Sequence, residues 1–305
     1  MGAAIAILCA LGSAVCFGTG DFLAQGLTRK HGSLSAILAV QIASTSLLAL
    51  VVLVRHGAPP AFVAELPMLL LLGLANTLGI VALYRSFEVG KISLVSPIAG
   101  SMGAFSVAFA WLAGEAPAPG TMLALVLVVA GIIVTSIIHE PAQQRETGGP
   151  TSKGSLARAV GVGWALLSAL CFGWVFWALA PSSARIGEDW VLLALRVVAV
   201  ALLFPLYRRL RRHLHRDTVP ARALTVPVLV VAALDSGGML LYAFAGSHSL
   251  GTGQLATVAV LASSFPLVTI ALAHLRLRES LRSWQWFGVA AVIGGVVWLS
   301  AVFAR

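Results

Sequence analysis

The sequence has few charged residues. Asp, Glu, Lys and Arg make up 10% of its 305 residues, whereas about a quarter is usual in a soluble domain. Hydrophobic residues make up 59%, and the mean hydropathy is +0.96. A chain with so little charge cannot cover a water-exposed surface, so this composition indicates an integral membrane protein. The three cysteines, Cys9, Cys16 and Cys171, lie in apolar runs without metal-ligand spacing, and they predict neither a disulfide framework nor a metal site.

Motifs for catalysis and ATP binding are also missing. The chain has no GxxxxGK[ST] loop, which argues against ATP-driven transport within it. It has no GxSxG or HExxH motif, and His248 and His274 have no evident partner for catalysis. We therefore predict that the protein is not an enzyme, has no catalytic residues and binds no cofactor.

Long uncharged windows are what the sequence does contain. About 20 helical residues cross the ~30 Å hydrocarbon layer of a bilayer. The alternation typical of a membrane barrel is absent, so these windows predict an all-α membrane protein with ten transmembrane helices. The windows cover residues 3–27, 33–54, 66–86, 92–113, 119–138, 157–180, 189–207, 223–247, 252–274 and 283–304.

Basic residues are concentrated on one side of this predicted topology. Connections that follow odd-numbered spans hold most of them, including the run RRLRRHLHR at 208–216, while the other side has Arg55, Arg185 and Arg305. The positive-inside rule then predicts a multi-pass protein of the cell (inner) membrane with both termini outside. We interpret the run as an anchor on anionic lipid, so the net charge of +9 does not predict a nucleic-acid partner.

The chain repeats itself once. A shift of 155 residues aligns ALGSAVCFG (10–18) with ALLSALCFG (165–173) and Gln41 with Arg196. We predict a first five-helix repeat over residues 1–138, a polar linker over 139–156 and a second repeat over 157–305. Because five spans are an odd number, the two repeats enter the membrane from opposite sides. Such inverted repeats are common in secondary transporters.

Residues 258–297 resemble the second repeat of EamA-type proteins in the drug/metabolite transporter superfamily. There a proline, a glutamate, a glutamine and two glycines recur, matched here by Pro266, Glu279, Gln285, Gly288 and Gly295. The first repeat keeps Glu115 and Gly131 but has Met102 at the proline position. The resemblance covers nearly the whole chain and implies a membrane transporter of small molecules, without naming a substrate.

Asp21 lies inside the first predicted span. It precedes Arg29 by eight residues, or ~12 Å along a helix, which places it within the hydrocarbon region. The stripe Ala14, Gly18, Asp21 and Gln25 is small or polar, so this face is expected to contact protein or water. Three roles stay open for the carboxyl group: a proton carrier, a substrate ligand, or a hydrogen-bonded structural group.

Arg196 and Asp235 are two further charged residues within predicted spans. Arg196 is seven residues from Asp189 and Asp235 is thirteen from Arg222, distances of ~10 Å and ~20 Å along helices that enter from opposite sides. Their similar depth predicts an ion pair, with a structural or gating role. The alternative is that Arg196 extends to the outer interface.

Other residues are weaker candidates for a substrate or proton pathway. Asn76 and Gln41 could instead join helices, and the aromatic residues, Tyr84 included, could anchor at the interface or pack. Proline frees a backbone carbonyl within a helix, and neighbouring serines can bind it. The pathway candidates are Asp21, Gln25, Asn76, Pro97, Ser101, Trp174, Trp177, Asp235, Tyr242 and Ser264.

These features predict a secondary transporter, expected to export a small metabolite or amphipathic compound by alternating access. Protons are the candidate coupling ions, and the lipid bilayer and a small-molecule substrate are the expected partners. A channel or a membrane scaffold is the alternative, although no pore-lining filter segment is evident. An intramembrane enzyme is a further alternative that would need a converging nucleophile and base. The oligomeric state is not predicted.

Overall fold

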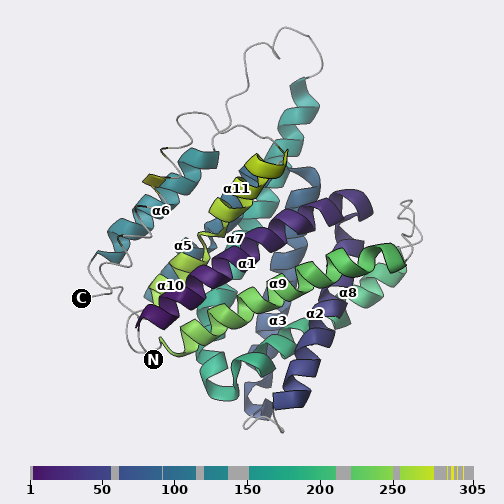
Figure 1. Cartoon of the computed structure of the whole chain (residues 1–305), viewed down its shortest axis with the longest axis vertical. Coiled ribbons are helices and arrows are strands. Elements are labelled where there is room, and N and C mark those ends of the chain that lie inside the picture. The colour runs from purple at the N-terminus through teal and green to yellow at the C-terminus, as the bar shows by residue number, and fades with distance from the viewer. Residues whose placement is uncertain are drawn as a thin grey trace.

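The computed structural model describes residues 3–55, 62–90, 92–114, 120–136, 151–210, 221–249 and 255–277, with 287, 290, 291, 294 and 298 as separate positions. All regular elements in these residues are helices (Figure 1). They are α1 (Ala3–His31), α2 (Ser33–Arg55), α3 (Phe62–Val89), α4 (Ile92–Gly100), α5 (Met102–Leu112), α6 (Thr121–Ser136), α7 (Thr151–Ile186), α8 (Glu188–Leu210), α9 (Ala221–Ser247), α10 (Leu255–Ala262) and α11 (Phe265–Leu277).

Six helices are long and apolar enough to cross a membrane, namely α1, α2, α3, α7, α8 and α9. The expected spans at 92–113 and 252–274 are each broken into two helices, α4–α5 and α10–α11. Helix α6 has 16 residues, and the expected span at 283–304 lies outside the described residues apart from separate positions. Helix α7 begins at Thr151, so the last residues of the expected linker are helical, and α7 extends beyond the bundle at the top of Figure 1.

Serines lie at both helix breaks. Helix α4 ends before Ser101. The Ser101 hydroxyl donates to the carbonyl oxygen of Ile98 at 2.7 Å. Ser264, between α10 and α11, makes the same bond at 2.7 Å. Pro266 follows as the second residue of α11, a position where a missing backbone N–H breaks no helical bond. At each break the same carbonyl oxygen also accepts the backbone N–H of the serine at 3.1 Å, so a tight turn with two hydrogen bonds ends the first helix.

Two equivalent turns show that the 155-residue shift holds in three dimensions. Gly32 between α1 and α2 has φ of 81°, and Gly187 between α7 and α8 has φ of 93°. Each glycine N–H donates at 2.8 Å to the carbonyl oxygen four residues earlier. Glycine adopts this left-handed conformation without a Cβ clash, so both turns reverse the chain tightly in the same way.

The helices pair in a pattern that repeats between the two halves. Helix α1 packs along α9, and α7 packs along α3. Likewise α1 contacts α10 and α11, while α7 contacts α4 and α5. The broken helices cross each other, with α4 against α11 and α5 against α10. Figure 1 shows α1 and α9 side by side across the face of the bundle.

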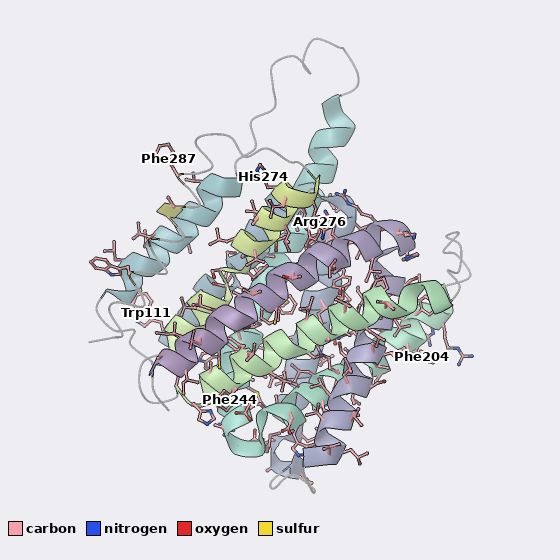
Figure 2. All side chains as sticks on the ribbon, viewed as in Figure 1. Trp111, Phe204, Phe244, His274, Arg276 and Phe287 are labelled. Carbon is pink, nitrogen blue, oxygen red and sulfur yellow. The ribbon has the colours of Figure 1, made fainter. Side chains whose placement is uncertain are left out.

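The exterior of the bundle is apolar. Leu53, Val63 and Leu112 are each more than four-fifths exposed, at 81%, 83% and 85%. Figure 2 shows His274 and Arg276 at one end of the bundle and Trp111 and Phe244 toward the other. Apolar surface on this scale is typical of contact with lipid, and the positions of charge and aromatic residues fit the two membrane interfaces.

Candidate functional site

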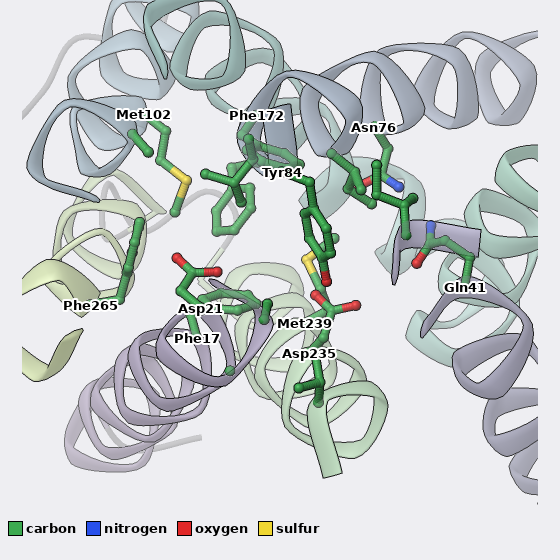
Figure 3. Close-up of a pocket in the computed structure, with 18 residues that line it drawn as sticks. Phe17, Asp21, Gln41, Asn76, Tyr84, Met102, Phe172, Asp235, Met239 and Phe265 are labelled. Atoms are coloured by element: carbon green, nitrogen blue, oxygen red, sulfur yellow. The ribbon is translucent and has the colours of Figure 1, made fainter. Parts of the chain in front are cut away.

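A cavity lies at the centre of the helix bundle. It encloses about 60 Å³, which holds roughly four to six water molecules at 10–15 Å³ each. Helices α1 to α5 of the first half and α7, α9 and α11 of the second half contribute side chains (Figure 3). The lining residues are Phe17, Gly20, Asp21, Ala24, Ile37, Gln41, Asn76, Ile80, Leu83, Tyr84, Ala99, Met102, Phe172, Phe176, Val231, Asp235, Met239 and Phe265.

Two carboxylates from neighbouring helices enter this cavity. Asp21 comes from α1 and Asp235 from α9. Helix α1 continues to His31, so Asp21 and Arg29 lie on one continuous helix, as the sequence-based estimate of depth assumed. Asp21 has no hydrogen bond or ion pair with any residue in the described part of the chain, and its carboxylate points into the cavity in Figure 3. The two carboxylates lie near enough to interact electrostatically.

Arg196 stands behind the cavity and contacts one of these carboxylates. Its Nη2 lies 2.6 Å from Oδ2 of Asp235, and its Nη1 donates to Oε1 of Gln41 at 3.0 Å. Arg196 is 1% exposed, so its charge is removed from solvent. A buried charge requires such partners. The guanidinium therefore links α8 to α9 and, through Gln41, to α2 in the other half.

Two buried amide side chains at the cavity have atoms without a hydrogen-bond partner among the described residues. Asn76 on α3 and Gln41 on α2 are each 1% exposed. Both amide atoms of Asn76, and Nε2 of Gln41, have no hydrogen-bond partner among the residues that the structure describes. A buried polar atom without a partner costs about 1–3 kcal/mol. These amides are thus available to a water molecule or a ligand in the cavity.

The aromatic walls come from equivalent positions in the two halves. A Cβ atom on Gly238 of α9 would lie 2.9 Å from the Phe17 ring, and one on Gly79 of α3 would lie 3.0 Å from the Phe172 ring. Both glycines let a ring approach the facing helix closely. Because these contacts are equivalent, α3 corresponds to α9 with a shift of 159 residues, whereas Phe17 corresponds to Phe172 with a shift of 155.

The two shifts relate the central polar residues. A shift of 155 residues relates Gln41 on α2 to Arg196 on α8, and a shift of 159 residues relates Asn76 on α3 to Asp235 on α9. The same pair of positions between the second and third helices of each half is neutral in the first half and charged in the second. Asp21 corresponds to Phe176 and so has no acidic counterpart.

Several residues expected on the pathway do not line the cavity. Trp174 and Trp177 are partly buried and pack against the hydrophobic core. Ser101 and Ser264 bind backbone carbonyls at the helix breaks, and Gln25 is buried elsewhere on α1. The side chain of Pro97 lies outside the described residues, as do Glu115 and Glu279.

Tyr242 also faces away from the cavity. Its hydroxyl donates to the backbone oxygen of Phe176 at 2.7 Å, and the two rings lie 4.1 Å apart. Tyr84 and Tyr242 are 158 residues apart in the sequence. The structural shift is 159, and one residue rotates a position by about 100° around a helix. Tyr84 lines the cavity and Tyr242 packs behind it for this reason.

Sequence reasoning missed most of the apolar lining. Phe17, Phe172, Phe265, Met102 and Met239 resemble many other apolar residues in the chain, so composition does not single them out. The repeat could have found some of them, because the 155-residue shift aligns Phe17 with Phe172. In the described part of the chain, no group of three or more His, Cys, Asp or Glu residues could hold a metal ion.

Comparisons with known proteins agree with this architecture. A solved structure titled "Crystal structure of protein" superposes with a TM-score of 0.68 over 100% of this chain and 99% of its own, at 15% sequence identity. At that identity the likeness shows the fold alone. A search of curated proteins by sequence gives no match. The sequence model of the EamA-like transporter family matches twice, over residues 4–137 and 159–301. The chain is therefore a multi-pass membrane protein that belongs to the EamA-like transporter family of the drug/metabolite transporter superfamily.

Proposed function

We propose that the protein is a secondary transporter that moves a small metabolite or amphipathic compound by alternating access. The position of the cavity carries the proposal. Both halves of the chain line it, and its polar groups lie among apolar walls deep in the bundle. Sites between two repeats are typical of secondary transporters, because rocking one half against the other opens the site to either side.

The proposed topology has ten spans in two inverted repeats, over residues 1–138 and 157–305, joined by the linker 139–156. Helices α4 and α5 together form one span, and α10 and α11 form its equivalent. The repeated pairing of α1 with α9 and of α7 with α3 supports this assignment. We place the protein in the cell membrane with both termini outside, and we assign export as its direction.

The central polar residues have separate proposed roles. Asp21 exchanges a proton or a ligand with the cavity, since it has neither a hydrogen bond nor an ion pair within the described residues. Arg196 and Asp235 form a structural or gating pair. Asn76 offers a donor and an acceptor to the substrate. Asp235 is the ionisable neighbour that influences Asp21 electrostatically, and Asp21 in turn influences Tyr84.

Reconstitution of the full chain in proteoliposomes tests this function. The vesicles are loaded with unlabelled amines, amino acids, sugars or carboxylates, and uptake of the labelled compound is measured in counterflow. For one class we expect saturable uptake that the internal compound accelerates and an imposed pH gradient changes. Asp21→Asn should remove the effect of the gradient. Flux that is linear with concentration, without acceleration, would show a channel instead.

A further inference from the structure

We infer that the cavity binds a small organic ammonium ion, with the charged nitrogen at Asp21 and the apolar body against the aromatic walls. This inference names the substrate class of the proposed transporter and so rests on that proposed function. It comes from the balance of charge in the cavity, the nature of its walls, and the unsatisfied amide atoms of Asn76 and Gln41.

The charge balance of the cavity is negative. Its charged lining residues are Asp21 and Asp235, and none of the lining residues is Lys, Arg or His. Arg196, behind the wall, lies 2.6 Å from Asp235 and compensates that carboxylate. Asp21 has no equivalent cation in the described ranges. A cationic ligand would supply the missing charge, whereas an anion would meet a second negative charge.

The walls around Asp21 suit an apolar body that carries a cation. The rings of Phe17, Phe172, Phe176 and Phe265 line the cavity together with Met102 and Met239. In Figure 3 the Asp21 carboxylate points into the space between Phe17, Phe265 and Met102. Aromatic faces attract organic cations, and thioethers adapt to apolar groups of different shape. A strongly hydrated inorganic cation would gain little from such walls.

The far side of the cavity offers hydrogen bonds. Asn76 and Gln41 are buried there with amide atoms that no described residue satisfies, and Figure 3 shows both on the opposite side from Phe265. A ligand with a nitrogen at Asp21 and a neutral polar group at its other end would bind both sides. The volume of about 60 Å³ is smaller than the roughly 150 Å³ of a cavity that holds benzene. The ligand is therefore at most a short chain or a single ring, and a ring requires the walls to move apart.

Four small probes that share a phenyl ring test the inference by equilibrium binding to the purified full chain. Benzylamine is a cation at neutral pH, benzyl alcohol is neutral, benzoate is an anion, and phenylglycine adds a carboxylate to benzylamine. We expect benzylamine to bind at least about tenfold more tightly than the other three, because only it both fits the walls and neutralises Asp21.

Variants then assign the preference to the carboxylate. Asp21→Asn should reduce benzylamine affinity about tenfold and leave benzyl alcohol affinity within a few fold. Asp21→Glu should keep the preference for benzylamine. Glu65→Gln is the matched control outside the cavity, since Glu65 pairs with Arg185 at 2.8 Å at the end of the bundle, and its affinities should equal those of the unchanged protein.

The outcomes separate this inference from the proposed function. Tighter binding of benzyl alcohol, benzoate or phenylglycine than of benzylamine by the unchanged protein would overturn the ammonium inference, and so would no binding of any probe. The comparison of the four probes uses the unchanged protein, so it does not depend on whether the Asp21→Asn variant folds. Benzylamine binding without counterflow would uphold the site and contradict transport. Counterflow of an anion or a sugar without benzylamine binding would uphold transport and overturn the inference.

Discussion

Four residues at the centre of the protein show how equivalent positions can carry different chemistry. Gln41 and Asn76 are neutral amides, whereas their counterparts Arg196 and Asp235 form an ion pair. A buried guanidinium loses its hydration, and the contacts with a carboxylate and an amide oxygen offset that loss. The two members of the pair are unequally buried, since the side chain of Arg196 is 1% exposed and that of Asp235 is 29% exposed. Substitution of Arg196 and substitution of Asp235 should therefore lower the free energy of unfolding by different amounts.

Asp235→Asn should be the more damaging single substitution, because it leaves the Arg196 charge buried with one amide contact. We expect a loss of about 3–5 kcal/mol in the free energy of unfolding. Arg196→Gln should cost less, since the remaining carboxylate faces the cavity. The double variant Arg196→Gln/Asp235→Asn reproduces the amide pair of the first half. It should be more stable than Asp235→Asn alone. Thermal unfolding in detergent measures the three variants, and strictly additive losses would exclude coupling between the two residues.

At the scale of elements, close contacts between helices position the cavity walls. The pair α1 and α9 meets where Gly238 faces Phe17, and the pair α3 and α7 meets where Gly79 faces Phe172. A serine–glutamate hydrogen bond occurs at equivalent helix ends in both halves, but the serine and the glutamate have exchanged positions. Ser247 donates to Glu188 at 2.6 Å, and in the first half the equivalent positions hold Glu88 and Ser33, which also form a hydrogen bond. Each third helix is thus attached to the start of the second helix of its own half.

Gly238→Ala should disturb the cavity although it adds only a methyl group. The new Cβ would lie 2.9 Å from the Phe17 ring and 3.2 Å from Cys16, so the ring must move. We expect a loss of about 1–3 kcal/mol in stability, together with weaker benzylamine binding. Gly237→Ala is the control on the same helix, because nothing lies within 4 Å of its Cβ. It should be neutral or stabilising by up to about 1 kcal/mol. Equal effects of the two substitutions would argue against a packing role for Gly238.

At the scale of the whole molecule, the two halves share one cavity but differ in what they contribute to it. The first half supplies Asp21 and the amides, and the second half supplies Asp235 with the compensating Arg196 behind it. In the proposed transport cycle, rocking of the halves would keep this central set in place while access changed at the two ends of the bundle. The ends themselves differ in charge, which sets the orientation proposed for the membrane.

Labelling of single cysteines tests this orientation in intact cells. In a variant without Cys9, Cys16 and Cys171, His248→Cys places a thiol after α9 and Lys30→Cys places one at the end of α1; both positions are exposed. A membrane-impermeant maleimide should label His248→Cys in intact cells and Lys30→Cys only after permeabilisation. The opposite pattern would place the termini inside and reverse the proposed topology.

The membrane class, the repeat and the family could all be predicted from the amino-acid sequence. Charge content, apolar windows and the 155-residue shift are properties of the chain, because burial in lipid demands apolar helices irrespective of how they pack. Counting residues from the span ends also brought Arg196 and Asp235 to similar depth, and they are in contact in the structure. Asp21 stood out for the same reason, since a carboxylate inside an apolar run is costly.

The set of side chains that meet in the cavity could not be predicted from the sequence, because it depends on how the helices pack. Rotation about a helix axis depends on interhelical packing, so a register difference of one residue placed Tyr84 in the cavity and Tyr242 behind it. The breaks at Ser101 and Ser264 depend on the crossing of α4–α5 with α10–α11, which local sequence does not specify. The aromatic walls were equally hidden, because phenylalanines that face lipid, core and cavity are chemically alike until the helices are packed together.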